Sequence, residues 1–365
     1  MTPWSVSEMS KNKELEPLRH QIDEIDEKLL NLINDRVRLA SEIGSRKTGL
    51  GAPVYRPERE VQILERLIKS SQGPLSEDAI KAIFREIISA ARGVEASLTV
   101  AVLGPKGTFT EQAAYKVFGQ QIDVVPASSI KEVFRLTETG AAHFGVVPVE
   151  NSTEGGVNAT LDLMLETELT ICNEVDLRVS HCLLAHADAK KPETIAGHEQ
   201  ALAQCRGWLA ENFPQLDQVA TSSTADAARA AADDPGILAV ASELAGRVYG
   251  LEIRAREIED VPGNTTRFLV ISKQTAEPSG RDKTSIAVAN PDQSGALLRL
   301  LEPFADSKIS MTRIESRPMR PQLWRYVFFI DIEGHIEDPS VSEAVERIKG
   351  ESAFFKLLGS YPRSI

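Results

Sequence analysis

The chain has 365 residues, of which 42% are hydrophobic and 26% charged, and its formal net charge is −12. This composition is typical of a folded globular protein, and at roughly 150 residues per domain the length predicts two or three domains. The negative net charge repels phosphate backbones and anionic lipids, so neither nucleic acid nor a membrane surface is expected as a partner.

Nothing in the sequence indicates membrane insertion or export. No apolar run approaches the roughly 18 residues that a membrane helix needs, and residues 1–16 are polar, without the apolar centre of a signal peptide. The three cysteines, Cys172, Cys182 and Cys205, are too few and too scattered for a disulfide framework. We therefore expect a protein of the reducing cytoplasm.

The first part of the chain, about residues 1–96, is predicted to be helical. Apolar side chains recur at steps of three and four from Leu15 to Ile43, which defines one face of a single long helix. Such a face usually packs against another helix. A break near residues 49–53 precedes a second helix at about 57–70, and Ser76 can cap a third helix.

Two cations, Arg36 and Lys47, lie on the apolar face of the first helix. A charge that faces a core is costly unless an opposite charge meets it, so the pair indicates a site for a small polyanion. The alternative is that each charged tip snorkels to solvent. Arg19 lies about 25 Å from Arg36 along the helix, so it can serve the same ligand only from a second subunit; alone, it is an ordinary surface residue. Further charges, Arg56, Arg59 and Glu60, cluster just after the break.

In these residues the chain resembles the all-helical chorismate mutases that form the N-terminal part of bifunctional chorismate mutase–prephenate dehydratases. The matching segments are residues 18–19, 25–30, 36, 44–47 and 57–60. The resemblance implies an interlocked dimer in which Arg19 of the partner subunit, Arg36, Lys47 and Arg59 bind the carboxylates and ether oxygen of chorismate, while Glu60 binds a ring hydroxyl. One family pattern has aspartate in place of Arg56 and glutamine in place of Glu95.

Glu95 follows Ala91 by four residues and is therefore expected to face the interior. To donate a hydrogen bond to the ether oxygen it must carry a proton, which burial favours and nearby cations oppose. We expect mutase activity to fall at high pH and Glu95→Gln to flatten that profile. The rearrangement of chorismate is intramolecular, so it needs a folded substrate and well-placed cations rather than a nucleophile or a metal.

From residue 98 onward, short apolar runs alternate with helical patterns, which is typical of α/β architecture. Polar segments follow or precede predicted strands at three places, residues 104–110, 147–157 and 263–268. Ligands of α/β proteins collect at strand ends, so the three segments predict one shared cleft. The first segment alone could equally be an ordinary capped turn.

The three segments, GPKGTFT, VPVENSTEGGV and TRF, resemble the motifs of prephenate dehydratases in order and spacing. The resemblance implies a two-lobed α/β fold like that of periplasmic binding proteins, with prephenate in the cleft. It gives Thr266 the hydroxyl that helps the C4 hydroxyl group of prephenate to leave. Substrate contacts fall on Glu150, Asn151, Ser152, Arg267 and Phe268, with Thr108, Phe109, Ser128 and Ser129 as lesser candidates.

A neutral threonine is a weak acid, so Thr266 must act by hydrogen bonding or by relaying a proton. Another motif, HCxxxH at His181, Cys182 and His186, more often packs in a core than binds zinc, and no second ligand pair is visible. We therefore expect neither a metal nor a cofactor.

A polar linker at about residues 275–282 precedes a βαββαβ pattern, which is that of the ferredoxin-like split unit. Two segments here resemble the GAL and ESRP motifs of ACT domains in prephenate dehydratases, which bind phenylalanine between two subunits. The resemblance assigns phenylalanine to Gly295, Ala296, Leu297, Glu315, Ser316 and Arg317. A solvated strand end is the alternative for the second segment.

The sequence thus predicts an all-α mutase domain at 1–96, a two-lobed α/β dehydratase domain at 97–274 and a ferredoxin-like ACT domain at 283–365. We expect a bifunctional enzyme of phenylalanine biosynthesis that converts chorismate to prephenate and then to phenylpyruvate, forms a homodimer or higher homo-oligomer and is inhibited by phenylalanine. The alternatives are a catalytically silent amino-acid sensor and a mutase fused to prephenate dehydrogenase, although the chain lacks a nucleotide-binding fingerprint.

Overall fold

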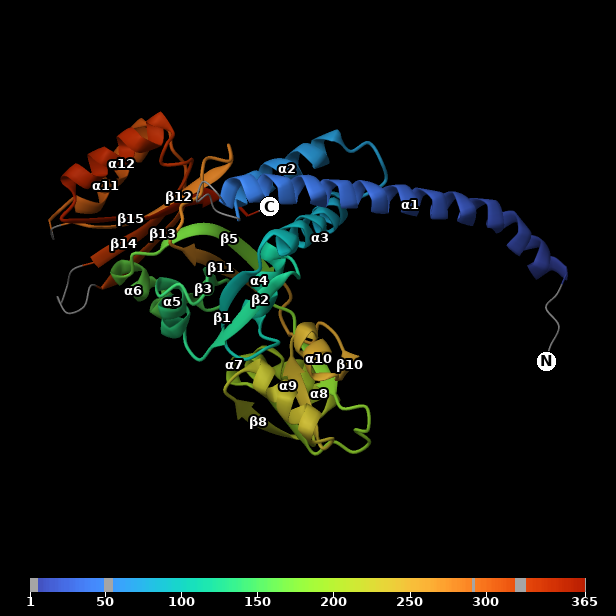
Figure 1. Cartoon of the computed structure of the whole chain (residues 1–365). Helices are drawn as coiled ribbons and strands as arrows, with labels where there is room; N and C mark the ends of the chain where they lie inside the picture. The colour runs from blue at the N-terminus through green and yellow to red at the C-terminus, as the bar shows by residue number, and fades with distance from the viewer. Residues whose placement is uncertain (1–5, 49–54, 291–292, 319–325, 365) are drawn as a thin grey trace.

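The computed structural model describes residues 6–48, 55–290, 293–318 and 326–364; within the first helix, side chains are described for residues 15–46. The chain forms a helical N-terminal region, a two-lobed central domain and a C-terminal domain (Figure 1). Among the described helices, none combines the length and the apolar character needed to cross a membrane.

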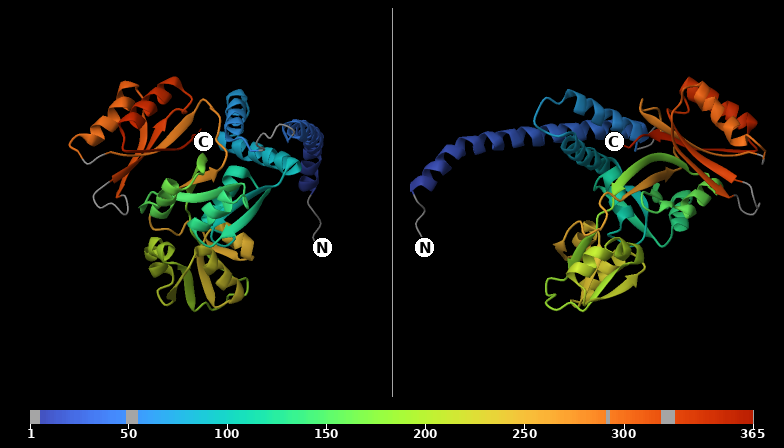
Figure 2. Two further views of the ribbon diagram at one scale, coloured as in Figure 1. Left: turned by 60° about the vertical axis from the view of Figure 1, so that its left-hand side comes forward. Right: turned by 180° about the vertical axis from the view of Figure 1, so that it is seen from behind.

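The described N-terminal region consists of α1 (Val6–Thr48), α2 (Pro57–Ser70) and α3 (Glu77–Glu95). The predicted cap of α3 is confirmed, because the Ser76 hydroxyl accepts a hydrogen bond from the Ala79 backbone N–H at 3.2 Å. One part of α1 packs on α3, while its N-terminal part projects away from the rest of the molecule (Figures 1 and 2). The predicted apolar face of α1 is left open: Leu18 is 56% and Leu32 65% exposed.

The first lobe of the central domain is a six-stranded sheet in the order β2-β1-β3-β11-β5, with β4 beside β3. Alternate side chains of its strands face helix α4 on one side and helices α5 and α6 on the other, so that Val100 and Ala101 belong to different apolar clusters. The elements are β1 (Leu98–Leu103), α4 (Phe109–Phe118), β2 (Ile122–Ala127), α5 (Ile130–Glu138), β3 (Phe144–Asn151), β4 (Gly155–Gly156), α6 (Asn158–Glu166), β5 (Thr170–Arg178) and β11 (Thr265–Ser272).

The second lobe is a five-stranded sheet in the order β10-β6-β9-β7-β8. The chain crosses between the lobes twice, from β5 to β6 and from β10 back to β11 (Figure 1), which confirms the predicted two-lobed fold. The elements are β6 (Cys182–Ala185), β7 (Thr194–His198), α7 (Glu199–Gln204), α8 (Arg206–Asn212), β8 (Asp217–Thr221), α9 (Thr224–Asp233), β9 (Ile237–Ala241), α10 (Glu243–Tyr249) and β10 (Glu252–Ala255). The strands of this lobe are only four or five residues long, and β8 is largely exposed, so their signal in the sequence is weak.

The C-terminal domain is a four-stranded antiparallel sheet in the order β13-β14-β12-β15, with both helices on one face. Its elements are β12 (Asp282–Ala289), α11 (Ala296–Asp306), β13 (Met311–Pro318), β14 (Tyr326–Glu333), α12 (Pro339–Glu351) and β15 (Phe354–Pro362). This order confirms the predicted βαββαβ unit.

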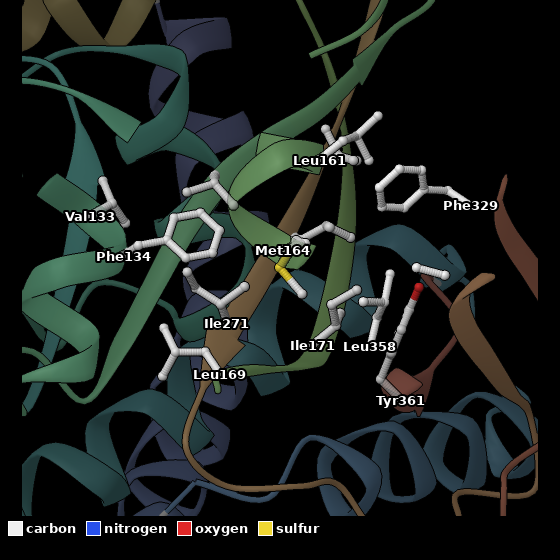
Figure 3. Packing of buried hydrophobic residues seen from close by; sticks show 14 of the residues in the cluster. Val133, Phe134, Leu161, Met164, Leu169, Ile171, Ile271, Phe329, Leu358 and Tyr361 are labelled. Atoms are coloured by element: carbon white, nitrogen blue, oxygen red, sulfur yellow. The ribbon is translucent and has the colours of Figure 1, made fainter. Parts of the chain in front are cut away.

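The other face of this sheet packs on the first lobe of the central domain. Phe329, Leu358 and Tyr361 join Met164 and Ile171 in one continuous apolar cluster (Figure 3). The backbones also approach closely there, since a Cβ at Gly359 would overlap the backbone of Ile171. A shared apolar core of this kind fixes the orientation of the two domains far more firmly than a linker does.

Candidate active sites

A cavity of about 630 Å³ lies between the two lobes of the central domain. Both lobes and both crossing segments contribute to its walls, and many of the contributing side chains carry hydroxyl, amide or imidazole groups. They include Thr108, Ser128, Asn151, His181, His198, Gln200, Gln204, Ser222, Thr224, Asn264 and Thr266. A pocket of this size and polarity can enclose a small polar metabolite.

Thr266 and Asn151 form the centre of this wall. They are paired across strands β11 and β3, and the Asn151 Nδ2 donates to the Thr266 hydroxyl at 2.8 Å. The orientation of the Asn151 amide is fixed, because its Oδ1 accepts from the backbone N–H groups of Thr153 and Glu154 at 2.9 and 3.2 Å. The Thr266 hydroxyl therefore accepts from Asn151 and keeps its own proton to donate towards the cavity.

The hydrogen-bond network continues towards the second lobe through residues that the sequence analysis missed. Asn151 Nδ2 also donates to Asn264 Oδ1 at 2.8 Å, and Asn264 Nδ2 donates to Gln204 Oε1 at 3.3 Å. The same Gln204 oxygen lies 2.9 Å from His181 Nε2, so this ring nitrogen carries the proton. Burial lowers the pKa of His181, partly offset by Gln204 and Glu259, which keeps the ring neutral.

His181 was expected only to pack in the core, yet it lines the cavity. A signal was present in the sequence, because the polar pair Ser180 and His181 interrupts two apolar runs where the chain passes between the lobes. Gln204 had no comparable signal, since it lies on a helix that follows a strand the sequence analysis did not predict.

The lesser candidates divide between cavity and framework. Thr108 lines the cavity beside Phe109 and also caps α4, where its hydroxyl accepts from the Glu111 N–H at 3.4 Å. Ser128 lines the cavity as well. Ser129 caps α5 through Glu132. Ser152, one of the main predicted substrate contacts, is exposed, lies outside the cavity lining and accepts from the Thr265 N–H at 3.0 Å.

Three predicted substrate contacts lie elsewhere. Glu150 pairs with Arg313 of the C-terminal domain at 2.9 Å, and Arg267 pairs with Glu174 of β5 at 2.7 Å. Phe268 is 2% exposed and packs in the core. Successive side chains of a strand point to opposite faces of the sheet. Thr266 and Asn151 therefore reach the cavity, while Arg267 and Glu150 face the C-terminal domain.

In the helical region, the structure brings Arg36 of α1 close to Glu60 of α2. Burial lowers the pKa of Arg36, and the Glu60 carboxylate opposes that shift. Burial raises the pKa of Glu60, which is opposed first by Arg92, whose Nη1 lies 3.3 Å from the Glu60 carboxylate. Arg85 faces the same carboxylate. These two arginines lie about one and three helical turns before the end of α3 at Glu95, and the sequence analysis did not single them out.

Glu95 is half-buried where α1 and α3 cross. A Cβ at Gly44 would overlap the Glu95 carboxyl group, so glycine allows this side chain to lie against α1. The glycine thus explains how the third helix can present Glu95 to the first.

Of the remaining predicted cations, Arg56 and Arg59 line one pocket together with Ile43 of α1, whereas Arg19 lies far along that helix. Arg56 pairs with Glu277 of the linker at 3.1 Å, and Arg59 is exposed on α2. Arg19 lies on the projecting part of α1, 3.8 Å from Glu16. Lys47 belongs to α1, but its side chain lies outside the described ones.

The predicted regulatory residues lie on the C-terminal domain. Gly295, with φ 76°, precedes α11, which begins with Ala296 and the 39% exposed Leu297. Glu315, Ser316 and Arg317 belong to β13, an edge strand of the sheet, and Arg317 pairs with Asp162 of the central domain at 3.1 Å.

Comparison with known proteins follows this division of the chain. Residues 18–96 match the model of chorismate mutase type II, residues 100–276 that of prephenate dehydratase and residues 284–350 that of the ACT domain. A protein of Stutzerimonas stutzeri named bifunctional chorismate mutase/prephenate dehydratase is 46% identical over 364 residues, covering 98% of this chain and 100% of that protein. The chain belongs to the bifunctional chorismate mutase/prephenate dehydratase family.

Other members and structures agree with this assignment. A bifunctional chorismate mutase/prephenate dehydratase of Pseudomonas aeruginosa is also 46% identical and covers 98% of the chain and 100% of its own length. The crystal structure of prephenate dehydratase from Arthrobacter aurescens in complex with L-Phe is 36% identical, covers 73% of this chain and 90% of its own, and superposes with a TM-score of 0.67. As a member of the family, the chain joins an isomerase and a lyase, so the mutase–dehydrogenase alternative is set aside.

Proposed function

We propose that the bifunctional mutase–dehydratase works at two separate sites, the mutase site at α1–α3 and the dehydratase site in the cavity between the lobes. The domain division that fits this is 1–96, 97–274 and 283–365. The observation that carries the dehydratase assignment is the Thr266 hydroxyl, held by Asn151 with its proton directed to the cavity.

At the dehydratase site, the C4 hydroxyl of prephenate must leave with a proton. Loss of carbon dioxide supplies the electron pair that expels this group, and formation of the aromatic ring drives the reaction forward. Thr266 donates a hydrogen bond to the departing oxygen, which leaves with the electrons of the C–O bond and becomes water by taking a proton from solvent, relayed through the Thr266 hydroxyl. The neutral His181 orients Gln204, and through Asn264 this network holds Asn151 in place. Help of this kind is typically worth ~10²–10⁴ in rate.

At the mutase site, Arg36 provides a cation that is already partly desolvated. A partly buried cation interacts strongly with negative charge that develops on the breaking ether bond. We assign Lys47, Arg59 and Arg19 of the partner subunit to the substrate carboxylates and ether oxygen, and Glu60 to a ring hydroxyl.

A homodimer would cover the open apolar face of α1. Leu29 on this face is 50% exposed, and a second α1 is the natural partner for a regular apolar seam. We expect Leu29→Glu to give a monomer that loses mutase activity and keeps dehydratase activity, as measured by mass in solution and by the two assays.

Phenylalanine is the proposed inhibitor, bound at residues 295–297 and 315–317 of the ACT domain. The support is the ACT match together with a solved prephenate dehydratase that contains L-Phe. Three buried, unpaired cysteines fit a cytoplasmic protein.

One assay tests the whole proposal. Purified protein is given chorismate, with and without a nicotinamide cofactor, and prephenate and phenylpyruvate are followed in time. We expect both products without the cofactor, and less phenylpyruvate when phenylalanine is added. A protein that binds phenylalanine but forms neither product would be the silent sensor.

A further inference from the structure

We propose that Arg267 and Glu150 are positioning residues through which the ACT domain controls the dehydratase site, rather than substrate ligands. This inference rests on the proposed inhibition by phenylalanine and adds the path by which it reaches the chemistry.

The path begins with the register of two strands. In the pairing of β11 with β3, Thr266 lies opposite Asn151 and Arg267 lies opposite Glu150. The first pair faces the cavity, and the second pair faces the ACT domain. The register shifts immediately after Arg267, and an irregularity of this kind lets a strand bend locally. One peptide unit joins Thr266 to Arg267, and another joins Asn151 to Glu150. A displacement of Arg267 and Glu150 therefore moves Thr266 and Asn151 as well.

Arg267 is the centre of a nearly dry ionic cluster between the domains. Its Nη1 lies 2.6 Å from Asp331 Oδ2, its Nε donates to Glu174 at 2.7 Å and its Nη2 donates to the Tyr361 hydroxyl at 3.0 Å. Lys283 also pairs with Glu174 at 2.7 Å, so two cations balance two carboxylates. The side chains of Arg267 and Asp331 are 12% and 6% exposed. Water screens such contacts little, so their geometry is costly to change.

Glu150 makes the second link, to the strand that carries the proposed phenylalanine ligands. Arg313 of β13 pairs with Glu150 at 2.9 Å and also contacts Glu315. Glu315 in turn lies against Gly156, where a Cβ would overlap its carboxylate. Any shift of β13 on binding phenylalanine therefore acts on Glu150 and on the loop that follows Asn151.

That loop sets the orientation of the Asn151 amide. The backbone N–H groups of Thr153 and Glu154 hold Asn151 Oδ1, and thereby aim Nδ2 at Thr266. A displacement of the loop turns the amide and breaks the hydrogen bond to the Thr266 hydroxyl. By linkage, the factor by which phenylalanine weakens prephenate binding is also the factor by which bound prephenate weakens phenylalanine binding.

The test uses substitutions on the ACT side, which leave the cavity wall unchanged. Asp331→Asn removes the partner of Arg267, and Arg313→Gln removes the partner of Glu150. Arg347→Gln is the matched control, since it breaks an exposed ion pair with Asp306 in the same domain, at 3.1 Å. For each full-length variant, the measurements are phenylalanine affinity by calorimetry, dehydratase inhibition by phenylalanine, mutase activity and the unfolding temperature.

We expect Asp331→Asn and Arg313→Gln to bind phenylalanine within about twofold of the parent, while the factor by which saturating phenylalanine inhibits the dehydratase is at least about fivefold smaller than in the parent, in keeping with the lower end of typical coupling factors. The control should match the parent. Unchanged inhibition in both variants overturns the inference, and so does a parallel loss of phenylalanine binding. If the parent itself binds no phenylalanine, the proposed regulation fails first. Should Asp331→Asn not fold, Arg313→Gln decides.

Discussion

Replacing Thr266 by valine tests the dehydratase site with little disturbance of its packing. Valine has nearly the same shape as threonine and lacks only the hydroxyl. The residue to be replaced, Thr266, is 8% exposed. Asn151 Nδ2 keeps one acceptor, Asn264 Oδ1 at 2.8 Å, and the N–H that loses Thr266 lies at the wall of the cavity, where water can accept from it. The loss of one hydrogen bond should therefore cost about 0.5–1.5 kcal/mol of stability. The rate should suffer far more, by ~10²–10⁴ in kcat, because the leaving oxygen loses its donor.

The two activities of the chain provide an internal control for this variant. Phenylpyruvate formation from added prephenate and consumption of chorismate are measured on the same preparation, together with the unfolding temperature. Mutase activity should be unchanged, and Thr266→Ser, which restores a hydroxyl, should recover a large part of the dehydratase rate. Dehydratase turnover within about threefold of the parent in Thr266→Val would refute a hydroxyl-dependent step, given the typical size of such help.

Three further predictions concern other groups. Arg36→Gln should lower mutase kcat/KM by ~10²–10³, as removal of a charge-stabilising group typically does, with prephenate turnover unaffected in the parallel assay. Mutase rates against pH should be flatter in Glu95→Gln than in the parent, and identical profiles would count against a protonated Glu95. Burial lowers the pKa of His181, so below about pH 6.5 this imidazole takes up a proton more readily in the unfolded chain than in the folded protein. The free energy of unfolding therefore falls as the pH drops below about 6.5. Denaturant unfolding at two pH values should show a smaller acid loss in His181→Gln.

Local signals predicted much of the fold. The 3.6-residue period and the capping Ser76 located the helices of the N-terminal region, and the order of apolar runs gave the βαββαβ unit. Polar segments at strand ends likewise predicted a cleft lined by Asn151 and Thr266. Each of these predictions rests on a pattern within a few residues of the chain, namely a period, a cap or a polar strand end, which a sequence shows directly.

The predicted substrate contacts that lie outside the cavity have a common physical cause. Thr266 and Arg267 are adjacent residues of one motif, so the sequence predicts both at one site. Neighbouring side chains of a strand point to opposite faces. The partners of Arg267 are Asp331 and Glu174, and both are distant from it in sequence. Gln204 was missed for the same reason, since only the fold brings it to Asn264.

The two active sites also differ in what completes them. The dehydratase cavity is walled by both lobes of a single chain, and its hydrogen-bond network closes within that chain. The mutase candidates do not close in this way, because Arg19 and Arg36 lie on one continuous helix, seventeen residues or about 25 Å apart along it. The apolar residues between them are exposed, with Ile25 at 53%. A second α1 laid against this face would bury those residues and bring its own Arg19 towards Arg36, so dimerisation and completion of the mutase site become one event.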